Sequence, residues 1–485
     1  MNKTIQIKLF WVLVAILLLV ISTVFILHSL SEEVVYHTDI LQDGTLILRK
    51  IDNFKGDTLE IPDVIGDLPI TSISNMALLA SDFDYEAVKR LILPNGIRTL
   101  YDDTFSKLTR LEEVSIGSAL EEFNPKAFRG VNYVSVQIDE DNIWLDTLEG
   151  CLVKNTGDRL ELCYGDHIPN GVAIVGDHAL AYRSFETITI PESVIYINKR
   201  AFMQCNNLTT INIPGNVRYI LEYAFTDCEN LESVTLQDGV ISIGEGVFSS
   251  CDKLSSVSLP DSLRTVGDWS FSTTSLTDVP YMGSVTKLPA CIFRGCDNMI
   301  FVHIPEGIQI IDEFAFSNCE NMQSITFPST LRIFESADII AGCNTLSELT
   351  VTENNLNYYS SSNCLVDRQT LSVVAALSNA VIPSGVKVIG EMAFSERHDL
   401  TCISVPDGVE KLEYSAFAYC YDLKSLYIPL SATEVEKRII GENADDMHIY
   451  CEAESQPDGW DENWNNAGYP VTWGVSREQF KELIK

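Results

Sequence analysis

The sequence has few basic side chains, since 33 Lys and Arg residues stand against 68 Asp and Glu residues. The formal net charge is −35, and so acidic a surface repels nucleic acid and anionic lipid headgroups. Motifs that carry chemistry are also missing: Cys-x-x-Cys, His-Glu-x-x-His, the phosphate-binding glycine loops and the nucleophile elbow do not occur. We therefore predict no enzyme, no catalytic residue, no metal site, no cofactor and no nucleic-acid partner.

Long hydrophobic runs are absent as well, with one exception at residues 9–27, LFWVLVAILLLVISTVFIL. As a helix, this run spans roughly 28 Å, close to the thickness of a bilayer's hydrocarbon core. Lys3 and Lys8 precede it and acidic residues follow, so the N-terminus is expected in the cytoplasm. We predict a transmembrane signal-anchor at 9–30 after a cytoplasmic segment 1–8, with the rest of the chain outside the cell. A cleaved signal peptide, which would leave a secreted protein, is the alternative.

An internal repeat dominates the rest of the chain. Its anchor phenylalanines are spaced by 23, 23, 23, 22 and 23 residues: Phe202, Phe225, Phe248, Phe271, Phe293 and Phe316. Apolar residues recur around each anchor, as at Val217, Ile220, Leu231 and Val234. A fixed period of this length indicates stacked units, each of which buries its apolar face only against its neighbours. The spacing from Leu231 to Leu236 predicts a short strand, and Ala224 to Cys228 predicts a helical turn on the opposite face.

Cysteines follow the same period, three residues after each anchor. With the phenylalanines they form a structural ladder: Cys205, Cys228, Cys251, Cys296 and Cys319, continued by Cys343 and Cys420. Thr274 and Arg397 occupy this position in their own repeats, so no disulfide is required there. We predict buried thiols that fill a small apolar slot.

The ends and two interruptions complete the organisation. We predict a β-hairpin cap at 31–69 with its turn at Asp43-Gly44, repeats at 70–430, and a C-terminal cap at 431–485. Hairpin insertions near 136–168 and 351–382 interrupt the repeats. In the last segment, 431–440 has helical spacing and Met447–Cys451 reads as a strand. Trp460, Trp464 and Trp473 are interpreted as covering the last coil, with a sugar-stacking site as the alternative.

The repeat unit resembles the BspA-like leucine-rich repeat of microbial surface proteins, also known as the Treponema-type family. The match is best at Ile213-Pro214, Ala224-Phe225, Cys228, Leu231 and Val234. The resemblance implies a β-rich (α/β-type) leucine-rich-repeat solenoid, a curved right-handed coil of about 23-residue repeats with N- and C-terminal caps, after one transmembrane helix. It also implies adhesion or recognition outside the cell, without enzymatic activity.

Outward-facing strand residues form the candidate ligand face. At one phase of the repeat they are Ser115, Thr189, Asn212, Thr235, Ser258, His303, Thr326, Thr350, Ser404 and Tyr427. Hydroxyls and amides spaced about 5 Å apart suit hydrogen bonding to a glycan or an extended peptide. The alternative is a strand face that is merely solvated. Acidic tracts at 139–142 and 458–463 are weaker candidates for calcium.

Two functions fit this sequence. The first is a membrane-anchored surface module that recognises an extracellular protein or glycan. The second is a structural spacer or scaffold of the cell envelope that has no soluble ligand.

Overall fold

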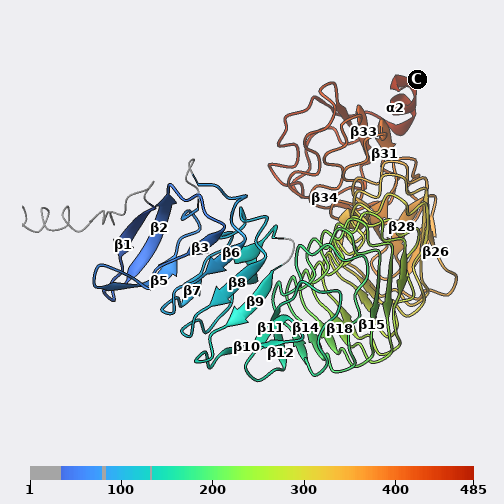
Figure 1. Cartoon of the computed structure of the whole chain (residues 1–485). Coiled ribbons are helices and arrows are strands. Elements are labelled where there is room, and N and C mark those ends of the chain that lie inside the picture. The colour runs from blue at the N-terminus through green and yellow to red at the C-terminus, as the bar shows by residue number, and fades with distance from the viewer. Residues whose placement is uncertain (1–33, 79–82, 132–133, 485) are drawn as a thin grey trace, which may run out of the picture. The chain divides into compact units, whose positions relative to one another are not determined.

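The computed structural model describes residues 34–78, 83–131 and 134–484, which fall into two compact units, 1–208 and 209–485 (Figure 1). In each unit the chain winds in coils, and strands of successive coils pair in parallel. Among the described residues, none forms a helix with the length and apolar character needed to cross a bilayer. The predicted signal-anchor at 9–30 lies outside the described residues.

The described residues of unit 1 contain fourteen strands and one 3₁₀ turn. They are β1 (Val35–Ile40), β2 (Leu46–Asp52), β3 (Thr58–Glu60), β4 (Val64–Ile65), β5 (Leu68–Ile73), β6 (Arg90–Ile92), β7 (Thr99–Leu100), β8 (Glu113–Ile116), η1 (Pro125–Phe128), β9 (Ser135–Ile138), β10 (Leu145–Leu148), β11 (Cys151–Lys154), β12 (Arg159–Leu162), β13 (Ile174–Val175) and β14 (Tyr196–Ile197). Strands β1 and β2 pair antiparallel around the turn at Asp43-Gly44, as the sequence predicts. The first insertion is the antiparallel set β10-β11-β12.

Unit 2 contains the remaining strands, a second 3₁₀ turn and the C-terminal helix. They are β15 (Thr210–Ile213), β16 (Tyr219–Ile220), β17 (Ser233–Leu236), β18 (Ser242–Ile243), β19 (Ser256–Ser258), β20 (Thr265–Val266), β21 (Lys287–Leu288), β22 (Phe301–His303), β23 (Ile310–Ile311), β24 (Ser324–Phe327), β25 (Ile333–Phe334), η2 (Ala337–Ile340), β26 (Glu348–Val351), β27 (Tyr358–Ser361), β28 (Cys364–Asp367), β29 (Ser372–Ala376), β30 (Val388–Ile389), β31 (Cys402–Ser404), β32 (Lys411–Leu412), β33 (Ser425–Ile428), β34 (Glu434–Val435), β35 (His448–Cys451), β36 (Val471–Thr472) and α2 (Arg477–Leu483). The second insertion is the antiparallel set β27-β28-β29.

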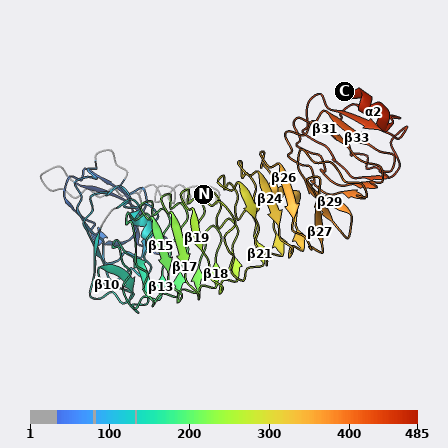
Figure 2. The same cartoon turned by 90° about the vertical axis from the view of Figure 1, so that its right-hand side faces the viewer.

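Each regular coil contributes to two sheets. The longer strand of the coil joins a long-strand sheet, such as β15-β17-β19, β22-β24-β26 or β31-β33-β35-β36 in unit 2 (Figure 2). The two-residue strand after the proline joins a short-strand sheet, such as β21-β23-β25. In β17 the side chains alternate, with Val234 and Leu236 buried and Thr235 exposed. One face of this sheet is therefore core, and Thr235 points to the other face.

The segments around the anchors from Phe202 to Phe316 are turns, so the helical turn predicted at Ala224 to Cys228 is wrong, whereas the anchor positions Phe128 and Ile340 end the 3₁₀ turns η1 and η2. Tyr223 and Asp227, two residues either side of Phe225, both have left-handed backbone angles, with φ of 61° and 58°. Such angles break a right-handed helix, so the anchor's amide is paired with the next coil instead. The amide of Phe225 donates to the carbonyl of Val247 at 2.9 Å, and that of Phe248 donates to Ser270 at 2.9 Å. This row of bonds is called the anchor ladder below.

Aromatic stacking runs along the anchor ladder. Phe225 stacks on Phe248 with ring centroids 5.5 Å apart, and the stack continues through Phe271 and Phe293 to Phe316 at 5.5–5.9 Å. All five rings are fully buried. Burying a phenylalanine contributes about 1.5–3 kcal/mol, so the stack is a main source of cohesion between coils.

The cysteine three residues after each anchor is buried as predicted, and it also acts as a hydrogen-bond donor. The thiol of Cys251 donates to the carbonyl of Phe225 at 3.2 Å, and that of Cys319 donates to Phe293 at 3.2 Å. Each acceptor is the anchor of the preceding coil. Cysteine therefore suits this position because it is small, apolar and still able to satisfy a buried carbonyl.

Arginine replaces this cysteine in the coil that follows each insertion. Arg183 and Arg397 are both buried at this position. The Nη1 of Arg397 lies 3.4 Å from the carbonyl oxygen of Ile340, the anchor that precedes the second insertion, and its Nε donates to Ala376 at 2.7 Å. Arg183 donates to Val131 across the first insertion at 3.1 Å. A long donor is needed because the insertion separates two coils that would otherwise be adjacent.

One expectation for the C-terminal segment is corrected and one is confirmed. Residues 431–440 hold β34 and turns, because their apolar residues continue the coil pattern and Glu434 pairs with Lys411 of the coil before. The predicted strand at 447–451 is present as β35. The helix lies further on, as α2, which begins with a capping box of Ser476 and Gln479.

Replacement of the bridging arginine tests this packing. We expect Arg397→Met to lower the free energy of unfolding by about 1–3 kcal/mol, because the carbonyls of Ile340 and Ala376 lose their donor in a buried site. The exposed Arg332→Met is the matched control and is expected to change little. The measurement is the urea midpoint of the full-length protein followed by circular dichroism. Equal midpoints for the two variants would contradict the bridging role.

Candidate functional site

The predicted ligand face is most open on β15-β17-β19. Asn212, Thr235 and Ser258 are partners in the parallel register of these strands, and all three side chains are exposed. The backbone partners of these strands are the neighbouring long strands, so the outward side chains line up in one row. This row of three, called the open row below, offers two hydroxyls and one amide to a partner. Gln237 extends it, since its Nε2 lies 3.3 Å from Oδ1 of Asn212.

The row on β22-β24-β26 is less available. His303, Thr326 and Thr350 are again in register, but the hydroxyls of Thr326 and Thr350 bond each other at 2.9 Å and both residues are half-buried. His303 is exposed, and its Nδ1 lies 3.9 Å from Asp278. Phe301 lies two residues before His303 on the same outward side and is 58% exposed. The sequence analysis did not name Phe301. Its position two residues before His303 places it on the same face of the strand, and this spacing could have identified it.

The C-terminal end of the predicted face is covered by the chain itself. Tyr427 is fully buried, because Phe480 of α2 packs on its ring at 5.1 Å and the guanidinium of Arg477 lies 4.7 Å from the ring centroid. Arg477 also donates to the hydroxyl of Ser404 at 2.7 Å and pairs with Asp407 at 2.8 Å. Tyr427 is thus removed from the candidate ligand face, whereas Ser404 stays exposed with its hydroxyl bonded to Arg477, and Figure 2 shows α2 beside β31 and β33.

In unit 1 the two row residues have different surroundings. Ser115 on β8 lines a shallow depression of about 200 Å³ together with its register partner Gln137 and with Asp139. Pairing of Thr189 is limited to a single bridge with His167, outside any regular strand, and its side chain is exposed. Ser115 therefore remains in the candidate face. Thr189 lies outside the long strands, at a position where the pairing consists of a single bridge.

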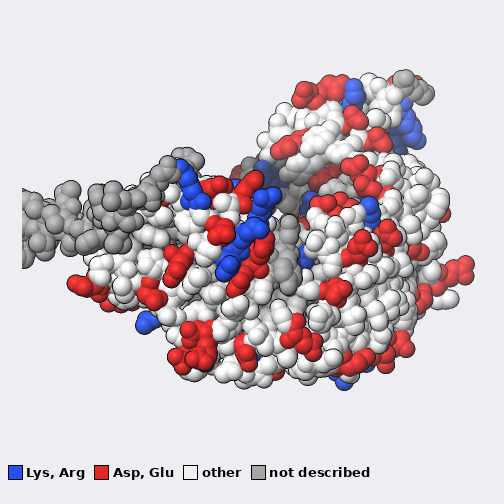
Figure 3. All heavy atoms as spheres, viewed as in Figure 1, with Lys and Arg blue, Asp and Glu red and all other residues white. Residues whose placement is uncertain are grey.

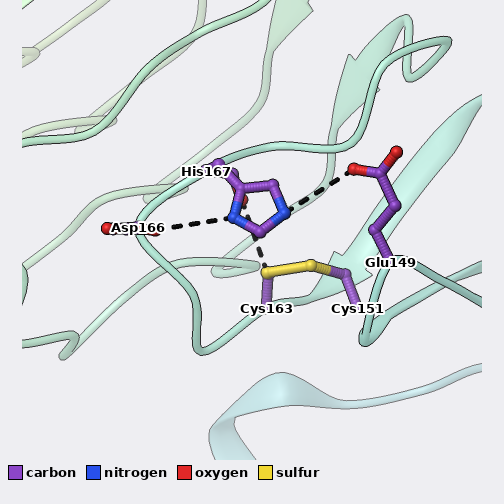
Figure 4. Close-up of a disulfide and its surroundings, with 5 residues drawn as sticks. All are labelled: Glu149, Cys151, Cys163, Asp166 and His167. Carbon is purple, nitrogen blue, oxygen red and sulfur yellow. Dashed lines mark hydrogen bonds and ion pairs between the residues drawn. A yellow bond between two sulfur atoms is a disulfide. The ribbon is translucent and has the colours of Figure 1, made fainter.

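A disulfide closes the first insertion. Cys151 and Cys163 stand on β11 and just after β12, and they are bonded to each other (Figure 4). His167 lies above the bridge, with its ring nitrogens 3.6 Å from Glu149 and 3.5 Å from Asp166. All three side chains are about half exposed or more, so these contacts contribute little to stability.

The acidic tract at 139–142 includes Asn142, whose side chain forms hydrogen bonds with the backbone. The buried amide of Asn142 donates to the carbonyls of Gly117 and Leu120 and accepts the amides of Trp144 and Leu145. In the second insertion Asn355 makes the corresponding four bonds. Asn142 thus has no oxygen left for calcium, and within the described ranges no group of three or more His, Cys, Asp or Glu is arranged for a metal.

The tryptophans near the C-terminus cover the last coil. Trp460 and Trp464 are buried, with ring centroids 4.9 Å apart, and Trp473 packs on both. The indole nitrogen of Trp460 donates to the carbonyl of Ala432 at 2.8 Å. Buried rings with satisfied donors do not present a face for sugar stacking, so the cap interpretation is preferred.

Comparison with known families identifies the repeat. A model of the BspA type leucine rich repeat region matches six copies, over residues 71–149, 173–300, 286–373 and 366–444. The chain belongs to this family. The matched range 173–300 contains the anchors Phe202 to Phe293 and the paired strands β15, β17 and β19 described above.

Several solved structures are similar to this BspA-type chain. A leucine-rich repeat protein from Bacteroides ovatus is 19% identical, with a TM-score of 0.47 and coverage of 92% of this chain and 100% of that one. A leucine rich cell surface protein from Faecalibacterium prausnitzii is 22% identical, with a TM-score of 0.40 and coverage of 69% and 97%. The T. pallidum leucine rich repeat protein is 26% identical, with a TM-score of 0.27 and coverage of 30% and 69%. No curated protein matches the chain.

The disulfide predicts a thiol count. Unreduced, denatured full-length protein with its thirteen cysteines should titrate eleven thiols with a chromogenic reagent, and thirteen after reduction. We expect Cys163→Ala, which reproduces the Ala376 found opposite Cys364 in the second insertion, to lower stability by about 2–3 kcal/mol through loss of a short cross-link. Cys364→Ala serves as the matched control for loss of a buried sulfur without loss of a cross-link. Thirteen thiols before reduction would refute the disulfide.

Proposed function

We propose that this BspA-type chain is a non-catalytic recognition or adhesion module that binds an extracellular protein or glycan at the cell surface. In support, the chain belongs to the BspA-type family, and one similar solved structure is described as a leucine rich cell surface protein. The observation that carries the proposal is the open row, in which Asn212, Thr235 and Ser258 present polar groups in register on a rigid sheet. A partner with evenly spaced donors and acceptors, such as a glycan or an extended strand, matches this geometry.

A location outside the cytoplasm is part of the same proposal. The Cys151–Cys163 disulfide supports it, because such bonds persist in oxidising compartments and are rare in reducing ones. The apolar run at 9–27 supplies the membrane anchor, with residues 1–8 in the cytoplasm and the repeats outside. The net charge of −35 keeps such a surface soluble and disfavours anionic partners over most of it (Figure 3).

Substitution in the open row tests the proposal. We expect Thr235→Arg to reduce binding of the full-length protein to arrayed glycans, matrix proteins or intact cells about tenfold or more, because a bulky cation replaces a hydroxyl at the centre of the row. Folding should be unaffected, since the side chain at this position is exposed.

Thr265→Arg is the matched control. Thr265 is an exposed threonine on β20 in a short-strand sheet, so the variant introduces the same group on another face. Equal loss of binding in both variants would contradict recognition by the open row. Absence of binding by folded protein to every array would favour the spacer or scaffold function instead.

A further inference from the structure

Unit 1 contains a pocket of about 590 Å³ beside the first insertion. Its walls come from η1 and the loop before it, from β11 and β12, and from the turns after β13 and β14. Five basic residues line it: Lys126, Lys154, Arg159, Lys199 and Arg200. The whole chain has only 33 Lys and Arg among 485 residues, so their convergence on one pocket is unusual for so acidic a protein.

Acidic residues in the lining neutralise only part of this charge. Lys126 pairs with Asp102 at 3.2 Å, and Arg159 lies 2.9 Å from Glu161 and 3.6 Å from Asp177. The ammonium group of Lys154 donates to a backbone carbonyl, which carries no net charge. Glu122 is the fourth acidic residue of the lining, so the basic residues exceed the acidic ones by one.

The pocket contains a buried histidine, whose pKa depends on its burial and on the charges around it. His178 lies between these groups, and burial, with Lys126 and Arg200 adding to it, lowers the pKa of its imidazole to about 4. Asp177 and Asp102 oppose this shift without cancelling it. The imidazole is therefore neutral at pH 7.

The second insertion provides an internal comparison. Its strands β28, β29, β30 and β32 repeat the registers of β11, β12, β13 and β14, and η2 repeats η1. The five basic positions correspond there to Asp338, Asp367, Ser372, Tyr414 and Ser415. The same backbone thus forms with two negative charges in place of five positive ones. The fold does not require the basic residues, which points to a role in binding.

We propose that this pocket binds the carboxylate, sulfate or phosphate group of an anionic ligand. Lysine and arginine donate charge-assisted hydrogen bonds to such groups, and a partly enclosed site strengthens them. The open row and this pocket involve different residues, so the proposal goes beyond the function proposed above and does not depend on it.

The ligand is either a free inorganic anion or the acidic sugar of a glycan. Both share the charged group, whereas only the sugar offers hydroxyls to the carboxylates of Asp102 and Glu122. Titration calorimetry of the full-length protein with sulfate, phosphate, glucuronate and neutral glucose separates the two sources. Tighter binding of glucuronate than of the inorganic anions supports the sugar. Equal or tighter binding of sulfate or phosphate rejects the sugar and retains a bare anion.

Charge reversal locates the site. We expect Lys126→Asp combined with Lys154→Asp, which copies the second insertion, to weaken anion binding about tenfold or more. Lys253→Asp combined with Lys424→Asp makes the same charge change at exposed lysines of unit 2 and should leave binding unchanged. If both double variants weakened anion binding equally, the effect would come from the overall charge of the protein, and the proposed site would be contradicted. If the charge-reversal variant does not fold, Lys126→Met combined with Lys154→Met is used in its place.

A spectroscopic readout is independent of affinity. The bound anion should raise the pKa of His178 from about 4, because it offsets Lys126 and Arg200, and ¹³C-histidine NMR follows this with His178→Gln for assignment. Neutral glucose should leave the midpoint in place. If neither glucuronate, sulfate nor phosphate at about 50 mM moves the His178 midpoint or shows calorimetric binding, the anion site is wrong.

Discussion

The structure depends on the contact between one anchor turn and the next. A single coil of about 23 residues is too small to bury its phenylalanine, so the ring is covered only when a neighbouring coil stacks on it. In the run of coils from Phe202 to Phe316, two left-handed residues flank each anchor and prevent a helix, and the amides of Phe225, Phe248, Phe271 and Phe293 donate to the next coil. The thiol three residues later returns a bond to the coil before. A coil that has both the phenylalanine and the cysteine therefore contributes a ring, an amide and a thiol to its neighbours.

The two insertions separate coils that would otherwise stack directly, and they show how contact between those coils is kept. Both add an antiparallel set of strands, and both are followed by an arginine in the cysteine position that reaches back to the preceding coil. An asparagine begins each insertion with four equivalent hydrogen bonds. With this backbone in common, the side chains around the insertions are free to differ, as the basic pocket and the disulfide of the first one illustrate.

The sequence predicted the elements that recur and missed those that do not. The anchors, the buried cysteines, the hairpins and the outward row all follow from offsets that can be counted along the chain. The anchor turn was predicted as helical because Phe225 and Cys228 are three residues apart, which is the spacing of a helical turn. The same spacing also occurs in a turn with left-handed residues on either side of the phenylalanine. Tyr427 had the correct phase, but its cover, α2, begins fifty residues later. The basic pocket joins residues from Lys126 to Arg200, which only the stacking of coils brings together.

Hydrogen exchange on the full-length protein tests the anchor ladder most directly. The amides of Phe225, Phe248, Phe271 and Phe293 lie in turns, yet each donates to the next coil at 2.9–3.0 Å. If these bonds hold the solenoid together, the four amides exchange as slowly as those of the long strands β15 and β17. Exchange as fast as in the surface turns, with the strands still protected, would show that the sheets alone carry the stability and would contradict the account.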